Sequence, residues 1–233
     1  MNDIVIEVKN ATVRFNKSAE SISGLKEYII KMLKRELMFQ EFLALKNINF
    51  TVKRGESWGL IGKNGSGKST LLKLISGIIS PYQGNVTVNG SIELGAGFDP
   101  ELTAKENIFL NGALLGYSKR FIESHFQEIV DFAELNDFVD VPIKNFSSGM
   151  SARLGFAIAT VQKPDILIVD EVLAVGDLAF QQKCKERMES LLSNGTTLLF
   201  VSHSIEQVKE LCSKAIWIDN GEVRAIGDTS SVS

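Results

Sequence analysis

The sequence predicts an α/β fold with a mostly parallel β-sheet, and two patterns carry this prediction. Short, nearly continuous apolar runs occupy Ser57–Ile61 and Ile166–Val169, and each opens into a polar loop. Two further runs of this kind, Thr197–Val201 and Ala215–Ile218, each adjoin a segment with helical spacing. Strands that are apolar throughout are buried on both faces, which is typical of parallel sheets covered by helices. We therefore expect these four runs to be strands of one buried sheet.

The early part of the chain predicts strands of a different kind. Apolar and polar residues alternate from Ile4 to Val8 and from Ile48 to Val52. A period of two is typical of antiparallel strands with one face on the core and one face in water. We expect antiparallel edge strands here, in a smaller β subdomain.

A largely helical stretch is expected at about residues 98–163. Two segments have the pattern of capping boxes, which begin helices: Thr103-x-x-Glu106 and Ser204-x-x-Gln207. Between them, apolar residues recur at three- and four-residue intervals: Ile122, Phe126, Ile129, Val130, Leu154, Ala157, Ile158 and Val161. Because no convincing strand interrupts this stretch, we predict a helical subdomain inserted into the sheet domain.

An insertion at about residues 17–43 is expected to hold a basic amphipathic helix. Apolar residues repeat at Ile22, Leu25, Ile29, Leu33 and Leu37, with Lys26, Lys31, Lys34 and Arg35 interleaved. Two interpretations stay open: a helix that contacts lipid headgroups or a partner helix, and a surface helix with a solvated basic face.

Composition limits the remaining possibilities. The chain has 233 residues, 44% of them apolar, so residues 1–233 are expected to form one large domain rather than a disordered chain. Cys184 and Cys212 lie far apart and only two histidines accompany them, which indicates neither a zinc site nor a disulfide framework and fits a reducing compartment. A net charge of −3 argues against general nucleic-acid binding. The N-terminal segment lacks the pattern of a secretory signal.

A phosphate-binding loop is predicted directly after the strand Ser57–Ile61. The segment reads Gly62-Lys63-Asn64-Gly65-Ser66-Gly67-Lys68-Ser69-Thr70, and a helical pattern follows it up to Gly77. This is the GxxxxGK[ST] motif between a strand and a helix. Glycines let backbone N–H groups face a phosphate, and the helix N-terminus adds its dipole. Lys68 is expected to contact the β- and γ-phosphates and Ser69 to ligate Mg²⁺.

A carboxylate pair, Asp170 and Glu171, follows the strand Ile166–Val169. Beside a phosphate-binding loop, the first carboxylate of such a pair is placed to hold Mg²⁺ through water. The second is then placed to polarise the attacking water. We therefore expect nucleotide hydrolysis, with Glu171 acting on the water.

Several further motifs resemble those of ABC ATPases. The segment Phe146–Met150, with Arg153 three residues on, resembles the LSGGQ signature. The segment Asp170–Asp177 resembles Walker B with the D-loop, and Val201–His203 resembles the switch-histidine strand. The order and spacing of these motifs agree with those of ABC ATPases over nearly the whole chain. The resemblance implies a P-loop NTPase (RecA-like) core with a mostly parallel sheet, an antiparallel β subdomain and an inserted helical subdomain.

The resemblance also implies roles for individual residues. Two copies bind ATP head to tail, so that each P-loop faces the signature residues Ser147, Ser148 and Gly149 and the D-loop Asp177 of the other copy. His203 senses the γ-phosphate. The adenine stacks on an aromatic residue near the end of the first strand, where this sequence has Phe15. Most family members have a glutamine that contacts Mg²⁺ where this sequence offers Glu93, so Glu93 is the candidate substitute.

The residues of three segments make the resemblance to one group within this family more specific. The segments SSGM, DEVLAVGD and ELGAGFDPELTAKENI resemble the ATPase subunits that export bacterial cell-surface polysaccharides of the O-antigen and teichoic-acid type. This implies a peripheral protein at the cytoplasmic face of the cell membrane that uses ATP and Mg²⁺. Its expected partners are a second copy, separate transmembrane permease subunits and, through them, a lipid-linked polysaccharide, but no nucleic acid.

Two other functions agree less well with the sequence. Non-transport ABC ATPases that act on nucleic acid or the ribosome usually have two cassettes in one chain, or a long coiled coil between Walker A and the signature. This chain has one cassette, and the interval from Lys68 to Ser147 is too short for such a coiled coil. A nucleotide-binding regulator that hardly hydrolyses is disfavoured by the presence of Glu171 and His203.

Overall fold

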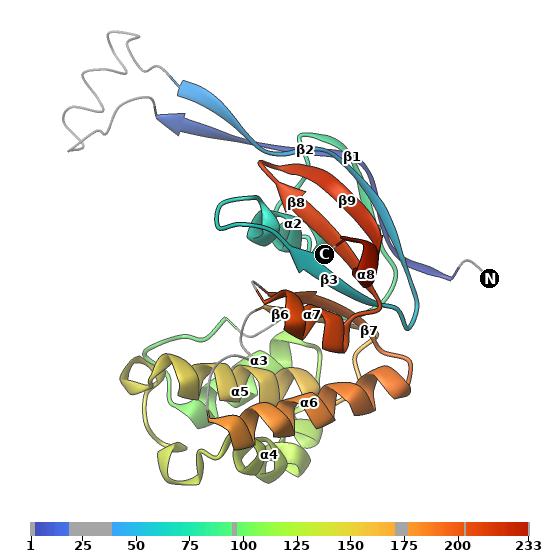
Figure 1. Cartoon of the computed structure of the whole chain (residues 1–233). Coiled ribbons are helices and arrows are strands. Elements are labelled where there is room, and N and C mark those ends of the chain that lie inside the picture. The colour runs from blue at the N-terminus through green and yellow to red at the C-terminus, as the bar shows by residue number, and fades with distance from the viewer. Residues whose placement is uncertain (1–2, 19–38, 95–96, 171–176, 203, 233) are drawn as a thin grey trace, which may run out of the picture.

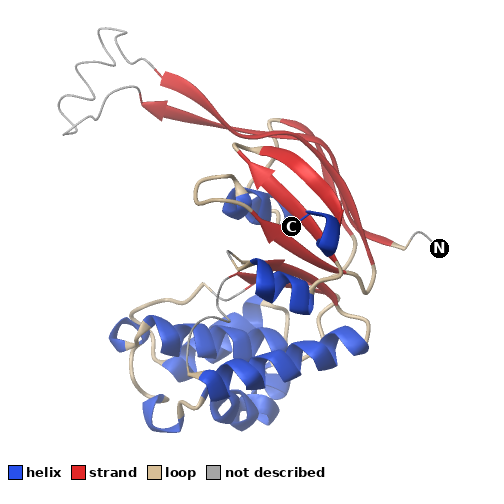
Figure 2. Cartoon of the chain, in the orientation of Figure 1, coloured by secondary structure: helices blue, strands red, loops and turns tan. Residues whose placement is uncertain are grey.

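A computed structural model describes residues 3–18, 39–94, 97–170, 177–202 and 204–232. In Figure 1 two β-sheets lie in the upper part of the molecule and the helices α3 to α6 lie below them. Figure 2 shows the same division between strands and helices. The predicted fold class is confirmed: a mostly parallel sheet, an antiparallel β subdomain and a helical group.

The larger sheet has the strand order β5-β6-β7-β3-β8-β9. From β5 to β8 neighbouring strands are parallel, and β9 runs antiparallel to β8. Its strands are β3 (Ser57–Ile61), β5 (Ile92–Leu94), β6 (Ile166–Asp170), β7 (Thr197–Val201), β8 (Lys214–Asp219) and β9 (Glu222–Asp228). The four predicted apolar runs therefore form β3, β6, β7 and β8.

Burial on both faces explains why these runs are apolar throughout. Along β6, Leu167 and Val169 pack into a core shared with the helical group, while Ile166 and Ile168 pack into a second core. That second core contains residues of the antiparallel sheet and of the helix after β3. The sheet is thus covered on both sides, as expected for parallel strands.

The smaller sheet corrects one prediction. It consists of β1 (Ile4–Ser18), β2 (Phe39–Lys53) and β4 (Gln83–Val88) in the order β2-β1-β4, all antiparallel. The first strand is therefore central and not an edge strand, because β4 pairs with its free side. No residue of β4 is fully buried, so its sequence carries little apolar periodicity and predicts no strand.

Two paired strands extend into the predicted insertion at about residues 17–43. β1 continues to Ser18 and β2 begins at Phe39, and the ladder pairs these two residues. The ends of the two strands form a ribbon that projects from the sheet (Figure 1). The ladder extends beyond the alternating pattern because backbone hydrogen bonds need no apolar side chains. The predicted helix at Ile22–Leu37 lies outside the described residues.

Helices occupy much of the stretch predicted to be helical. It contains α3 (Ala104–Leu114), α4 (Lys119–Ala133) and α5 (Ser148–Thr160), with short 3₁₀ turns at Asn136–Phe138 and Ile143–Asn145. The other helices are α2 (Lys68–Ile75), α6 (Leu178–Ser193), α7 (Ile205–Leu211) and the short α8 (Thr229–Val232).

One predicted capping box is confirmed, whereas only one of the two expected hydrogen bonds forms in the other. At α3 the Thr103 side chain accepts from Glu106 N, and the Glu106 carboxylate accepts from Thr103 N at 2.8 Å. At α7 the Ser204 side chain accepts from Gln207 N, but the Gln207 side chain does not return to Ser204. Gln207 Oε1 instead accepts from Ser202 Oγ at 2.8 Å, because the preceding loop brings this hydroxyl within reach.

Replacing Thr103 with alanine is expected to lower the free energy of unfolding by about 1 kcal/mol, because Glu106 N loses its acceptor and the Glu106 carboxylate loses the bond from the Thr103 hydroxyl. Hydrogen bonds from the Thr103 backbone and side chain lower the pKa of Glu106 from its ordinary value of 4.5. Their stabilising contribution is present above this value and is lost as the pH falls through the lowered pKa. Urea unfolding should therefore show a larger effect at pH 7 than at pH 3. Thr103→Ser, which keeps the hydroxyl, should change little, and an equal loss with Ser would contradict the capping role.

Candidate nucleotide-binding site

The predicted phosphate loop connects β3 to α2 in a backbone conformation that requires glycine. Gly62, Gly65 and Gly67 have φ values of 155°, 77° and 114°. A Cβ on Gly62 would lie 2.2 Å from the carbonyl oxygen of Ile218, and one on Gly67 would lie 2.9 Å from that of Ala44. The loop thus lies against the end of β8 on one side and against β2 on the other, where larger residues do not fit.

Donor groups converge inside this loop. Lys68 is 6% exposed, and its ammonium donates to the carbonyl oxygens of Gly62 at 2.7 Å and Lys63 at 3.1 Å. Among the described residues, Ser66 Oγ is the one buried side-chain polar atom that has no hydrogen-bond partner. The first N–H groups of α2 have no acceptors within the helix. An ammonium, an unsatisfied hydroxyl and a helix N-terminus fit a polyphosphate.

The remaining loop residues differ in accessibility. Asn64 and Ser69 are exposed, whereas Thr70 is half-buried in the first turn of α2. Ser69 is therefore accessible to a metal ion held beside the phosphates, as a hydroxyl ligand of Mg²⁺ must be.

The sheet register brings the other predicted segments to the same edge as this loop. Asp170 at the end of β6 pairs with Val201 at the end of β7, and Val201 pairs with Leu60 of β3. Because these strands are parallel, the segments that follow them all begin at one edge of the sheet. The side chain of Asp170, and all of Glu171 and His203, lie outside what the structure describes.

Two hydrogen bonds fix the described part of the loop after β7. Ser202 is buried, donates to Gln207 Oε1 and accepts from Ser204 N at 3.0 Å. The chain on both sides of position 203 is thereby tied to the first turn of α7.

Glu93 and Phe15 are placed differently relative to this edge. Glu93 lies in β5 in register with Leu167, three residues before Asp170 on the neighbouring strand. Three residues of a strand span about 10 Å. The side chain of Glu93 lies outside what the structure describes, so its contact with Mg²⁺ stays a prediction. Phe15 lies on β1 and is 43% exposed, opposite a strand whose residues Ala44 and Leu45 face Gly67 of the loop.

The predicted signature forms the start of α5. Ser147 is the N-cap, and its hydroxyl oxygen accepts from Met150 N at 3.2 Å. Ser148 is the first residue of the helix, and Gly149 follows it. Ser147 and Ser148 are both exposed, so that this helix N-terminus is accessible. In Figure 1, α5 lies in the lower part of the molecule and α2 in the upper part, so one chain does not bring the signature to its own phosphate loop.

Arg153 links the signature helix to two neighbouring helices, a role that the motif alone does not indicate. It pairs with Glu134 at the end of α4 at 2.5 Å and with Asp177 at the start of α6 at 3.8 Å. Its guanidinium also lies 4.4 Å from the ring centroid of Phe180. Asp177 itself caps α6 by accepting from Phe180 N at 2.9 Å. The structure therefore places Asp177 in a capping position beside the signature helix.

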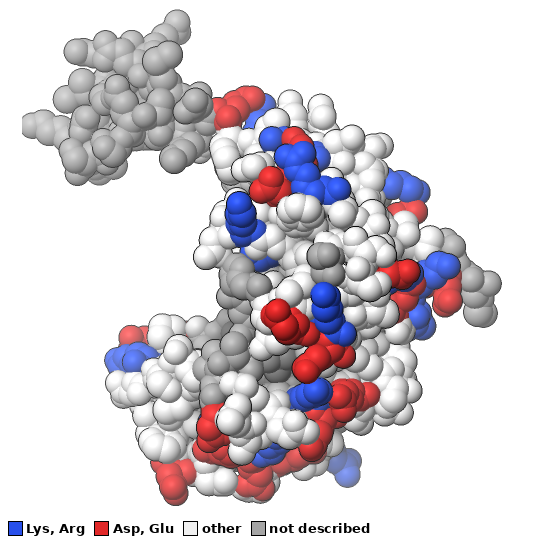
Figure 3. All heavy atoms as spheres, viewed as in Figure 1, with Lys and Arg blue, Asp and Glu red and all other residues white. Residues whose placement is uncertain are grey.

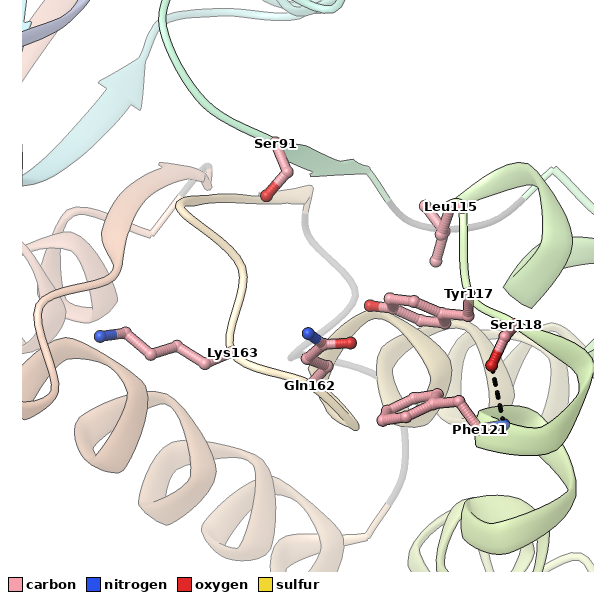
Figure 4. A pocket seen from close by; sticks show the side chains of 8 residues that line it. Ser91, Leu115, Tyr117, Ser118, Phe121, Gln162 and Lys163 are labelled. Carbon is pink, nitrogen blue, oxygen red and sulfur yellow. Dashed lines mark hydrogen bonds between the residues drawn. The ribbon is translucent and has the colours of Figure 1, made fainter.

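A cavity of about 370 Å³ lies away from all of these residues. In Figure 4, Tyr117 from the turn between α3 and α4 and Phe121 from the first turn of α4 face Gln162 from the segment after α5. The complete lining is Ser91, Leu115, Gly116, Tyr117, Ser118, Phe121, Gln162 and Lys163. None of the predicted nucleotide-site residues contributes to it.

On the face shown in Figure 3, acidic and basic side chains are mixed, and no continuous basic stripe crosses it. Within the described ranges, no helix is long and apolar enough to cross a bilayer.

Comparison with known proteins decides the family. The family profile described as ABC transporter matches residues 45–174, which is more than half of the chain. The chain belongs to the ABC transporter family. It is an ABC ATPase and binds ATP, and the matched segment contains the phosphate loop, the signature and the Walker B strand.

Curated relatives with high identity include ATP-binding proteins of O-antigen export and of teichoic acids export. The O-antigen export system ATP-binding protein RfbB of Klebsiella pneumoniae is 43% identical, over 98% of this ABC ATPase and 95% of its own length. The teichoic acids export ATP-binding protein TagH of Shouchella clausii is 45% identical, over 83% of this chain and 54% of its own length.

Solved structures confirm the fold. The ATP-binding cassette MJ0796, in a dimeric post-hydrolysis state bound to ADP and Pi, aligns with a TM-score of 0.78. The alignment covers 96% of this chain and 98% of that chain at 23% identity.

Proposed function

We propose that this ABC ATPase hydrolyses ATP to drive export of a lipid-linked cell-surface polysaccharide, of the O-antigen or teichoic-acid type, across the cytoplasmic membrane. The proposal is carried by the set of donors in the phosphate loop together with RfbB, which is similar over almost its entire length. ATP supplies the energy, and separate transmembrane permease subunits provide the path. The subunit itself acts at the cytoplasmic face of the membrane.

Different residues of one chain have different roles in binding and hydrolysing ATP. Lys68 and Ser66 and the first N–H groups of α2 bind the phosphates, and Gly62, Gly65 and Gly67 allow their close approach. Glu171 orients the attacking water, and His203 contacts the γ-phosphate. This division matches a reaction in which positioning and electrostatic stabilisation supply most of the rate enhancement.

Ser69 and Asp170 are the residues that would hold Mg²⁺, Ser69 directly and Asp170 through water. The accessible hydroxyl of Ser69 and the position of Asp170 at the sheet edge fit this ion. When bound, Mg²⁺ neutralises charge on the β- and γ-phosphates.

A head-to-tail homodimer completes each site. Ser147, Ser148 and Gly149 present a helix N-terminus that is accessible but lies apart from the phosphate loop of the same chain (Figure 1). Such a terminus favours an anion, so we infer that it binds the γ-phosphate held by the second copy. Asp177, which caps the next helix beside Arg153, lies near the same contact.

The helical part is the proposed docking surface of the permease. Leu110 and Leu114 lie one turn apart on α3 and are 37% and 72% exposed. Apolar side chains in this arrangement form a stripe that a partner helix can cover.

Mixing two inactive variants tests the shared site. Lys68→Ala removes one chain's phosphate contact, and Gly149→Asp places a carboxylate where the γ-phosphate of the second copy is expected. Each variant alone should be inactive. An equimolar mixture should recover about one quarter of the wild-type ATPase activity, because half of the dimers then contain one intact site of two. If the mixture stays inactive while both variants remain folded and form mixed dimers, the head-to-tail arrangement is wrong.

Reconstitution tests the transported substrate. The ATPase and its permease are placed in lipid vesicles with lipid-linked O-antigen or lipid-linked teichoic acid, and ATP-dependent translocation is measured. We expect translocation and stimulated hydrolysis with one of the two polymers. Hydrolysis stimulated by RNA or ribosomes, with no response to either polymer, would instead support the non-transport alternative.

A further inference from the structure

We propose that Phe42 is a second base-binding residue, which forms with Phe15 a two-ring site for the adenine of ATP. The proposal rests on the proposed function, since it takes the phosphate loop as the site of the triphosphate. Phe42 belongs to no motif in the sequence. Its position in the antiparallel ladder is what assigns it this role.

The register places the two rings on one face of the ribbon. Phe15 on β1 pairs directly with Phe42 on β2, and the preceding pair on the same face of β1 is Val13 with Leu45. The shift in register between these pairs leaves Ala44 without a partner in the ladder. Residues directly opposite each other on paired strands project to the same face. Phe15, Phe42, Val13 and Leu45 therefore share a face.

That face is the one that lies against the phosphate loop. A Cβ on Gly67 would lie 2.9 Å from Leu45 Cδ2, so the Leu45 side chain points toward the loop. The backbone of Lys46 donates to Gly221 O at 2.7 Å, and Gly221 N donates to Ser66 O at 2.8 Å. Phe15 lies two residues after Val13, the partner of Leu45, so the Phe15–Phe42 pair lies about 7 Å along the ladder from Leu45. A nucleotide whose phosphates occupy the loop can place its base beside this ring.

The pattern of exposure leaves the two rings accessible to a ligand. Val13 and Leu45 are 3% and 0% exposed, whereas Phe15 and Phe42 are 43% and 54% exposed on the same face. Exposed apolar side chains that lie side by side are typical of a binding surface. Among the described residues, neither ring takes part in an aromatic or cation–π contact.

The opposite face of the ribbon already has its partners. Arg14 forms an ion pair with Glu41 at 2.5 Å, and its guanidinium lies 3.9 Å from the ring centroid of Tyr82. Arg14 and Glu41 thus face away from the two phenylalanines. The chemistry left on the ring face is stacking. Every base has a π-face, so such a site binds by stacking area and discriminates little between exocyclic groups.

Truncation of Phe42 tests the proposal. Phe42→Ala is expected to raise the Kd for ATP about tenfold, because stacking of one base on one aromatic ring is worth this much or more. The Kd for inorganic triphosphate, which has no base, should not change. Both are measured by calorimetry. Leu43→Ala is the matched control: Leu43 is the next residue, is 40% exposed and pairs with Arg14 on the opposite face. Phe42→Trp, which keeps an aromatic ring at this position, should bind ATP about as tightly as the unchanged chain.

The outcomes separate this proposal from the proposed function. An unchanged Kd for ATP in Phe42→Ala, with weakened binding in Lys68→Ala, would overturn the role of Phe42 and leave the phosphate site intact. An equal loss of affinity for ATP and triphosphate would also overturn it, because the substitution would then act on the loop. If ATP affinity is unchanged in Lys68→Ala as well, the nucleotide site itself is wrong.

Discussion

Replacing Glu171 with glutamine is expected to lower ATP turnover about 100- to 10 000-fold while leaving ATP binding intact. Glutamine keeps the size and the hydrogen-bonding reach of the side chain but cannot accept the proton of the attacking water. ATP then persists between the two copies, and the closed dimer should accumulate. Steady-state ATPase assays measure the first effect, and size-exclusion chromatography with ATP measures the second.

A glutamate elsewhere on the chain provides the control for this substitution. Glu189 is exposed on α6, so Glu189→Gln makes the same chemical change away from the sheet edge. It should leave turnover and oligomeric state unchanged. Wild-type turnover in Glu171→Gln would show that another group acts on the water.

Replacing Lys68 with alanine is expected to raise the Kd for ATP about 10- to 100-fold, because a charge-assisted contact to the phosphates is lost. The effect should be large since the ammonium is buried at the centre of the loop, where water cannot replace it. Calorimetry with ATP and with inorganic triphosphate should show the same loss for both ligands. This common loss distinguishes a phosphate contact from a base contact.

The same helix supplies a control. Lys73 is exposed in the last turn of α2, and Lys73→Ala removes one positive charge at a distance from the loop. ATP affinity should stay close to that of the unchanged chain. Lys68→Met, which keeps the aliphatic stem in its buried site, guards against loss of folding. If both Lys68 variants are folded and bind ATP normally, the phosphate loop is wrongly assigned.

The strands of the parallel sheet could be predicted because they are buried on both faces. Such strands leave continuous apolar runs, and β3 and β7 begin and end where these runs do. β4 could not be predicted in the same way, because half-buried and exposed residues give no clear period. The length of the β1–β2 ribbon was also missed, since its pairing depends on backbone hydrogen bonds.

In the candidate site, too, local patterns could be predicted, whereas contacts between distant residues could not. The motif from Gly62 to Thr70 predicts a phosphate loop because glycines and lysine at this spacing are needed locally, and the structure supports that arrangement with the φ values of its glycines. The capping box at Thr103 is likewise local and is confirmed. The link made by Arg153 between three helices joins residues distant in sequence, and no spacing rule indicates it.

The fold class, the family motifs and the residues expected to act on ATP follow from local patterns along the chain. Which of these segments meet depends on the tertiary structure. It brought the ends of β3, β6 and β7 to one edge, separated the signature helix from the phosphate loop, and paired Phe15 with Phe42. The reason is physical: strand order, register and the packing of the sheet between two cores are set by contacts across the whole chain, and a local pattern does not contain them.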